Sequence, residues 1–189
     1  MVTNKMSKKC WLETLRGILA DLEAHGREPR LAIIGIGHEL CGDDGLGVAI
    51  SQALEIVFQN HGHVQVFTAG PAPENLCGPL RWFAPDLVVL IDAADVAQKP
   101  GDIRWLDLQK TDGVSASTHT LPLRILADYL IAEIGCKIVL LGVQPAKLAY
   151  GPISEAVEES VRTIIQGFRG LLTFEPSLSR QTHRSTINR

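Results

Sequence analysis

Short apolar runs alternate with longer amphipathic stretches along most of this chain. Three of the runs stand out: Leu31–Ile36, Leu87–Ile91 and Lys137–Val143. Strands that are apolar on both faces are typical of a parallel sheet covered by helices on both sides. The alternation therefore predicts an α/β fold: a three-layer α/β/α sandwich around a mostly parallel, twisted sheet of about five strands.

The spacing of apolar residues predicts the other elements. Further strands are expected at 64–68 and 103–107, helices at 8–25, 46–59, 76–82 and 121–134, a loop at 108–120, and a last helix that follows Ser154 and ends near Gly170. Ser154 is the expected N-cap of that last helix. We divide the chain into an N-terminal amphipathic helical extension (1–28), an α/β domain (29–173) and a polar, basic tail, expected to be disordered (174–189).

Composition excludes several classes of function. The 189 residues carry a net charge of −3, whereas a nucleic-acid surface is normally basic. No run approaches the roughly 20 apolar residues that span a bilayer, so membrane insertion is not expected. Charged residues interrupt the N-terminal stretch, which is therefore not a secretory signal. The cysteines are widely separated and form no CxxC pair, which favours a reducing, cytoplasmic setting: Cys10, Cys41, Cys77 and Cys136.

Acidic residues crowd the junction between the first strand and the next helix. The segment 33–47, IIGIGHELCGDDGLG, places Asp43 and Asp44 between glycines. Asp92 follows the third strand, and His119 precedes the helix that leads to the last strand. Ligands of open α/β sheets bind beyond the carboxyl ends of the strands. We therefore expect Asp44, Asp92 and His119 to lie at one edge of the sheet.

Two carboxylates and one imidazole make a mixed oxygen–nitrogen donor set. Such a set suits nickel, zinc, iron or manganese, whereas calcium and magnesium usually recruit more oxygens and no histidine. Three protein ligands also leave positions open for water or substrate. Each residue has a structural alternative: Asp43 and Asp44 suit a helix N-terminus, Asp92 suits a turn, and a lone histidine is often a surface residue.

Other kinds of site find less support. The first turn lacks the third glycine of a GxGxxG fingerprint and puts acids where a phosphate would bind. No GxSxG elbow and no HExxH motif occurs. A receiver-like phosphoacceptor domain also uses an acidic pair and a later aspartate, but it needs a lysine where this chain has the turn 142–145, GVQP. It remains a minor alternative.

Five blocks occur in an order that resembles a known family. They are GIGHELCGDDGLGV at the first strand–helix junction, GPAPEN at 70–75, LVVLIDAADVAQKPGDIRWLD at 87–107, STHTLPL at 117–123 and LLGVQPAKL at 140–148. Over the region from Leu31 to Leu171 the chain resembles the hydrogenase maturation proteases, most of all the branch that serves hydrogenases of the formate-hydrogenlyase type. One departure is His38, which stands where the family usually has asparagine.

The resemblance implies roles for individual residues. In the family, an acid of the first loop, an aspartate after the third strand and a histidine bind a metal, and these map onto Asp44, Asp92 and His119. Asp44 and Asp92 become the candidate catalytic residues, with an aspartyl-protease mechanism and a metal-dependent one both left open. The candidate substrate-binding residues are Gly42, Asp43, Gly70, Thr118 and Gln144.

The resemblance also implies a reaction and a partner. These endopeptidases remove a C-terminal peptide from the nickel-loaded large-subunit precursor of a [NiFe] hydrogenase during hydrogenase maturation. The nickel arrives with the substrate, and another divalent ion can occupy the site in vitro. The alternative is a non-catalytic, nickel-dependent chaperone or docking protein for the same subunit.

Overall fold

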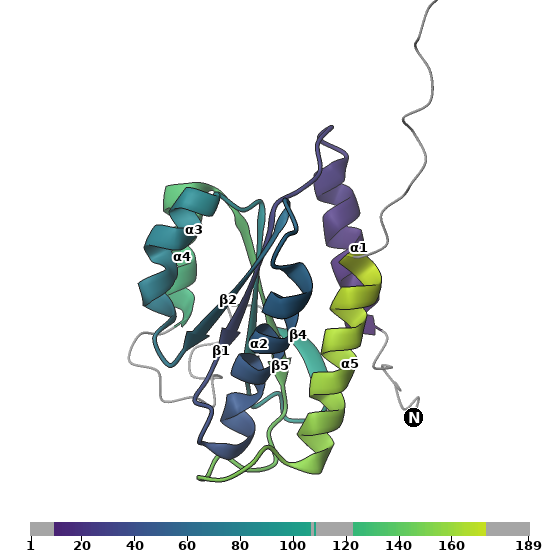
Figure 1. Ribbon diagram of the computed structural model, residues 1–189, viewed down its shortest axis with the longest axis vertical. Coiled ribbons are helices and arrows are strands. Elements are labelled where there is room, and N and C mark those ends of the chain that lie inside the picture. Colours follow the sequence, from purple (N-terminus) through teal and green to yellow (C-terminus); the bar gives the residue numbers. More distant parts are fainter. Residues whose placement is uncertain (1–9, 107, 109–122, 173–189) are drawn as a thin grey trace, which may run out of the picture.

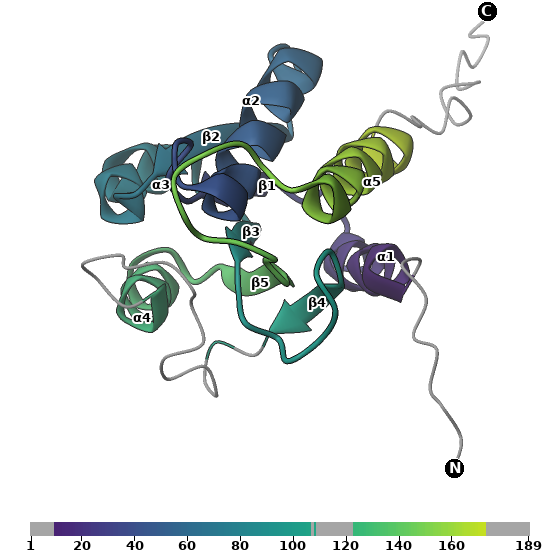
Figure 2. The same cartoon turned by 90° about the horizontal axis from the view of Figure 1, so that it is seen from below.

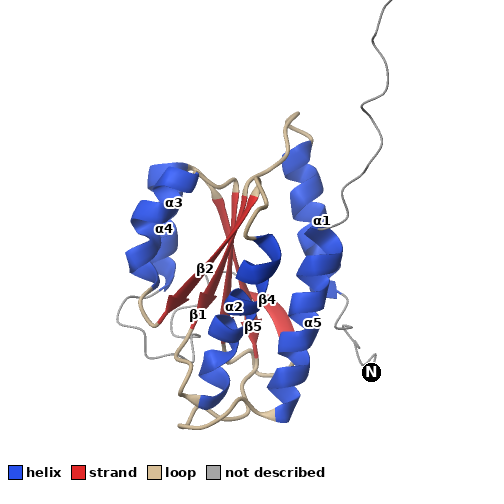
Figure 3. Ribbon diagram, in the orientation of Figure 1, coloured by secondary structure: helices blue, strands red, loops and turns tan. Residues whose placement is uncertain are grey.

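The computed structural model describes residues 10–106, 108 and 123–172 (Figures 1 and 3). In chain order the elements are α1 (Cys10–Glu23), β1 (Leu31–Ile36), the 3-10 turn η1 (Gly42–Gly45), α2 (Leu46–Phe58), β2 (Val64–Gly70), the 3-10 turn η2 (Pro73–Leu76), α3 (Cys77–Phe83), β3 (Leu87–Ala93), β4 (Ile103–Leu106), α4 (Leu123–Ile134), β5 (Lys137–Val143) and α5 (Glu155–Leu172). No helix among these residues is long and apolar enough to cross a membrane.

The strands form one five-stranded sheet in the order β2-β1-β3-β5-β4. Strands β2, β1, β3 and β5 are parallel to one another. Strand β4 pairs antiparallel with β5 at one edge of the sheet. This arrangement confirms the predicted α/β fold with a mostly parallel sheet. From β1 the chain moves outward to β2, whereas from β3 it moves outward to the other side, so the strand order reverses between β1 and β3.

Helices cover both faces of the sheet, as Figure 2 shows in a view from below. Alternate strand residues point to opposite faces. Leu31, Ile33, Val89 and Ile91 pack in one core cluster with residues of α1, α2 and α5. Ala32, Ile34, Val88 and Leu90 pack in the second cluster with residues of α3 and α4. The continuous apolar runs therefore arise because both faces of each central strand are buried.

The helix of the N-terminal extension belongs to this sandwich. Trp11 of α1 is buried and its ring lies against Phe168 of α5, with ring centroids 5.5 Å apart. The indole of Trp105 in β4 donates a hydrogen bond of 3.0 Å to the Trp11 carbonyl. Gly167 makes room for the contact, because a Cβ there would lie 2.6 Å from the Trp11 ring. Helix α1 thus packs beside α5 on the same face of the sheet, next to the edge strand β4.

Some boundaries differ from the predicted ones. β3 continues through Asp92 to Ala93, although the apolar run stops at Ile91. β2 extends to Gly70, and α5 extends to Leu172. Ser154 directly precedes α5, as predicted, and its hydroxyl donates a hydrogen bond to Asp43. The predicted disordered tail and most of the predicted loop at 108–120 lie outside the described residues.

Candidate active site at the carboxyl edge of the sheet

The predicted acidic residues lie at the carboxyl ends of two neighbouring strands, where the strand order reverses. β1 and β3 are paired, and Gly35 lies opposite Ile91. Asp92 is the next residue of β3, and Asp44 lies in η1 just beyond β1. Open α/β sheets bind their ligands at such a switch point. The fold therefore brings the strand ends that carry Asp44 and Asp92 to the edge where the sequence placed them.

Glycines let the acidic turn and the start of α2 pack directly on the strand ends. A Cβ at Gly47 would lie 2.2 Å from the Ile36 carbonyl oxygen and 2.4 Å from that of Ile91. A Cβ at Gly37, whose φ is +128°, would lie 1.8 Å from the Asp44 carbonyl oxygen. Such approaches are open only to glycine. The backbone of Asp44 is thereby fixed against the sheet.

The Asp44 carboxylate is only 7% exposed, and its two oxygens have different surroundings. Oδ2 accepts a hydrogen bond of 2.7 Å from the His38 amide. Oδ1 is buried and has no hydrogen-bond partner among the described residues. Buried carboxylate oxygens are normally hydrogen-bonded. Oδ1 thus keeps an acceptor position that no described residue fills.

Asp92 is fully buried within β3 and lies opposite Gly142 of β5. Strand alternation puts it on the same face as Val88 and Leu90, which is the face covered by α3 and α4. His119, the third predicted metal ligand, and Thr118 lie outside the described residues. Within the described residues, no group of three or more His, Cys, Asp or Glu side chains is arranged to hold a metal ion.

Asp43, although adjacent to Asp44, has a different environment. Its carboxylate is completely buried. Oδ2 accepts hydrogen bonds from the amides of Ala146 (2.7 Å) and Lys147 (2.9 Å) and from the Ser154 hydroxyl (3.0 Å). Oδ1 accepts one from the Ser154 amide (2.6 Å). These bonds tie η1 to the loop between β5 and α5, which favours a structural role for Asp43 over the predicted substrate contact.

The other described substrate-binding candidates also hold loops together. Gly42 has a φ of +59°, and a Cβ there would lie 2.8 Å from the carbonyl oxygens of Lys147 and Ala149. The carbonyl of Gly70 accepts a hydrogen bond of 3.1 Å from the Gly37 amide. The side-chain oxygen of Gln144 accepts one of 2.9 Å from the Val96 amide. All three shape the carboxyl edge through contacts within the chain.

His38, which stands where asparagine is usual, is exposed beside the candidate site. Its ring Nδ1 accepts a hydrogen bond of 3.3 Å from the Leu40 amide, two residues ahead. Asparagine side chains make the same local bond in turns. His38 can therefore replace asparagine without changing the turn that carries the amide donor to Asp44.

A cavity of about 280 Å³ lies next to His38. It is lined by Gly37 and His38 on one side and by Thr68 and Gly70, at the end of β2, on the other. The cavity thus lies beside the loop whose His38 amide binds Asp44.

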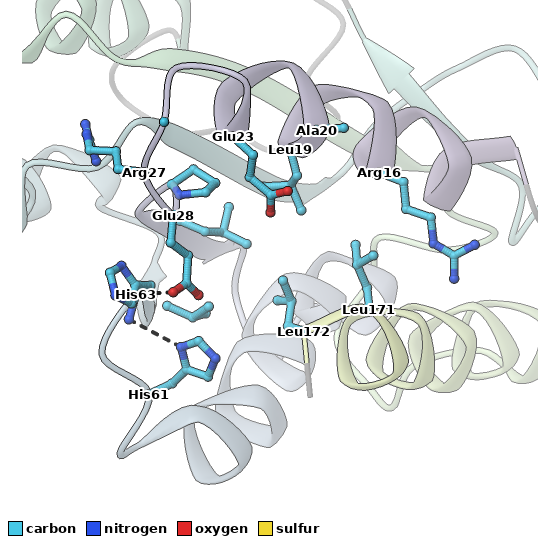
Figure 4. A pocket seen from close by; sticks show the side chains of 14 residues that line it. Arg16, Leu19, Ala20, Glu23, Arg27, Glu28, His61, His63, Leu171 and Leu172 are labelled. Atoms are coloured by element: carbon cyan, nitrogen blue, oxygen red, sulfur yellow. Dashed lines mark hydrogen bonds and ion pairs between the residues drawn. The ribbon is translucent and has the colours of Figure 1, made fainter. Parts of the chain in front are cut away.

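A larger cavity, of about 700 Å³, lies at the opposite edge of the sheet, where Leu31 and Val64 begin their strands (Figure 4). The ring Nε2 of His63 lies 3.4 Å from a carboxylate oxygen of Glu28 there, and the His63 amide donates to the ring of His61. Parallel sheets bind their ligands at the carboxyl edge rather than at the amino edge. This cavity is therefore separate from the candidate active site.

Comparisons with known proteins agree on one family. Residues 48–168 match the family model described as HycI, hydrogenase maturation protease. The hydrogenase 3 maturation protease of Escherichia coli strain K12 is 30% identical over 140 residues, which cover 73% of this chain and 88% of that protein.

Solved structures give the same result. The crystal structure of the [NiFe] hydrogenase maturation protease HycI from Thermococcus kodakarensis KOD1 matches with a TM-score of 0.72 and 34% identity, covering 82% of this chain and 99% of that one. The solution structure of the endopeptidase HycI from Escherichia coli matches with a TM-score of 0.64 and 29% identity, covering 75% and 92%. These matches favour the enzyme over the receiver-like domain and the non-catalytic chaperone.

Proposed function

The chain belongs to the hydrogenase maturation protease family, and we propose that it removes the C-terminal peptide from the nickel-loaded large-subunit precursor of a [NiFe] hydrogenase. It is an endopeptidase, as its relatives are. The observation that carries the proposal is the Asp44 carboxylate, which one hydrogen bond orients while its other oxygen has no partner among the described residues.

In this proposal Asp44 is the general base of peptide hydrolysis. The His38 amide holds Oδ2, so that Oδ1 faces the water that attacks the scissile carbonyl carbon. A carboxylate within hydrogen-bond reach of that water takes its proton as the new carbon–oxygen bond forms. The proton then passes to the leaving nitrogen when the carbon–nitrogen bond breaks. Asp92, the second carboxylate at this edge, shares in positioning the attacking water.

Nickel enters this reaction as part of the substrate. The predicted ligands Asp44, Asp92 and His119 supply oxygen and nitrogen donors, which suit nickel. Their contact with the metal would register that the large subunit is loaded and would place the bond to be cut beside Asp44. We assign the reaction to the cytoplasm, in keeping with free thiols at Cys41, Cys77 and Cys136.

Replacement of Asp44 by asparagine tests the assignment. Asparagine keeps an acceptor for the His38 amide but is not a base, so we expect the cleavage rate to fall about 100-fold or more. The measurement is mass spectrometry of the peptide released from nickel-loaded precursor. The matched control is Asp128→Asn on the exposed side of α4, which should cleave normally. Cleavage by Asp44→Asn at the wild-type rate would refute the catalytic role.

The same assay with nickel-free precursor tests the role of the metal. We expect no released peptide over the time in which loaded precursor is fully processed. Equal rates on the two precursors would show that the site does not recognise nickel, while leaving the endopeptidase assignment intact.

A further inference from the structure

Exposed apolar side chains gather on the two loops next to Asp44. Leu40, between β1 and η1, is 51% exposed. Leu148 and Tyr150, between β5 and α5, are 42% and 80% exposed. Exposed apolar residues that occur together mark contact sites for other molecules more often than single ones do.

Backbone hydrogen bonds join these two loops side by side. The Gly151 amide donates to the Leu40 carbonyl (3.1 Å), and the Gly42 amide donates to the Gly151 carbonyl (3.0 Å). Cys41 and Gly151 form an isolated parallel bridge. Figure 2 shows the second loop passing across the start of α2 on its way to α5. The loops that carry Leu40, Leu148 and Tyr150 are therefore joined, and we name these three exposed side chains the apolar rim.

Asp43 fastens the apolar rim to the acidic turn. Its carboxylate binds the amides of Ala146 and Lys147 before the exposed stretch and Ser154 after it. Its own amide donates to the Lys147 carbonyl at 2.9 Å. A loop that is already fixed loses little conformational entropy when a partner binds. Because Asp43 adjoins Asp44, a partner held on the rim is also held at a set distance from the reactive carboxylate.

We propose that the apolar rim is the docking surface for the protein substrate, the hydrogenase large-subunit precursor. The inference rests on the proposed function, because it assigns the occupant from the reaction at Asp44. Asp44 is nearly buried, so the peptide to be cut must enter from outside, and the rim lies on the loops that adjoin it. Tyrosine is enriched among residues that dominate the affinity of protein interfaces, and its ring loses little entropy when it is buried.

Steady-state kinetics with nickel-loaded precursor from the same genome test this proposal. In the double variant Leu148→Ser/Tyr150→Ser we expect KM to rise about tenfold or more, as for loss of interface anchors. The single-turnover rate at saturating protease should stay within about twofold of wild type, because neither side chain acts on the scissile bond. Thermal unfolding should be unchanged, since both side chains are exposed.

The matched control replaces two exposed apolar residues elsewhere. Ile56 in α2 is 74% exposed, and Trp82 in α3 is 84% exposed. Trp82 lines a cavity with Val64, at the amino end of β2, away from Asp44. Ile56→Ser/Trp82→Ser should leave KM unchanged. An unchanged KM in the rim variant, or an equal rise in this control, would overturn the proposal.

Two further measurements distinguish an error in the docking proposal from an error in the proposed function. Biolayer interferometry should show weaker binding of precursor to the rim variant than to wild type. If wild type binds precursor in a rim-dependent way but releases no peptide, the function is wrong and the docking surface stands. If wild type is a dimer in sedimentation and the rim variant is a monomer, the occupant is a second copy and the proposal is wrong.

Discussion

Asp43 joins segments of the chain that are 103 to 111 residues apart in sequence. The hydrogen bonds of its side chain run to the loop between β5 and α5, and both of its oxygens accept. The charge of a buried carboxylate is tolerated when hydrogen-bond donors surround it in this way. The acidic turn therefore contains one carboxylate whose two oxygens both accept hydrogen bonds and one, Asp44, with an oxygen that no described residue partners.

Replacement of Asp43 by asparagine should therefore destabilise the protein. An amide side chain has one acceptor oxygen instead of two, so at least one buried donor loses its partner, at a cost of about 1–3 kcal/mol. We expect a lower denaturation midpoint in urea with an unchanged m value. Asp128→Asn on the surface of α4 is the control and should unfold like wild type. An unchanged midpoint for Asp43→Asn would mean that the bonds to Ala146, Lys147 and Ser154 add no net stability.

For individual residues, the sequence predicted the acidic turn but not the different environments of its two aspartates. Asp43 and Asp44 look alike as neighbours in GDDG, and only the family resemblance singled out Asp44. What distinguishes them is the set of donors around each, and those around Asp43 come from a loop about a hundred residues away. Apolar spacing does not report such partners. His119 and Thr118 lie outside the described residues, so their roles stay predictions.

Single elements show how much the apolar pattern can specify. β1 and β5 have the predicted bounds. β1 is buried along its whole length, and a strand buried on both faces produces an uninterrupted apolar run. β3 was predicted to end at Ile91, but pairing with β5 continues through Asp92 and Ala93. A polar residue can end an apolar pattern without ending a strand, as Asp92 does in β3.

The helix α1 was predicted from its spacing, but its packing partners were not. Trp11, Leu15 and Leu19 are buried in the core cluster that also contains Phe168. The partners come from β4 and α5, which lie far along the chain. Amphipathicity reveals that a helix has a buried face, and the surface that covers this face depends on the assembled fold.

Truncation of Trp11 to alanine should cost about 3–5 kcal/mol, because it leaves a cavity between α1 and α5 and removes an aromatic contact. The readout is the free energy of unfolding from urea titration. Glu13→Ala, on the exposed side of the same helix, is the control and should change stability little. If Trp11→Ala were as stable as wild type, α1 would be an appendage rather than part of the sandwich.

On the scale of the whole molecule, the amino edge is held by an ionic contact. Asp86, just before β3, accepts hydrogen bonds from the Arg27 guanidinium and from the Arg30 amide (2.8 Å). Burial alone would raise the pKa of Asp86, but these hydrogen bonds and the two positive charges outweigh it, so the pKa is lowered. The contact links the segment after α1 to the start of β3 and so joins separate parts of the fold.

The lowered pKa makes stability depend on pH. Asp86 stabilises the folded state above the pKa of an unfolded aspartate, about 4, and this contribution disappears as the pH falls through the lower folded-state value. Arg27 is largely exposed, so solvent screening limits the contribution to about 1 kcal/mol. Asp86→Asn should be less stable than wild type at pH 7, and the two should converge in acid, as measured by urea unfolding from pH 2 to 7. A constant difference over that range would contradict the assignment.

The contact between Trp11 and Phe168 has a consequence for how the gene could be rearranged. The first and last helices of the sandwich touch, while the two joined loops next to Asp44 lie in the interior of the sequence. A circular permutation that joins the present ends and opens new ones between α2 and β2, near Gly62, would leave the loops that carry Asp44 and the apolar rim covalently intact. A Cβ at Gly62 would meet nothing within 4 Å, which marks that turn as uncrowded. We therefore expect the permuted chain to form the same site, although its elements follow one another in a different order.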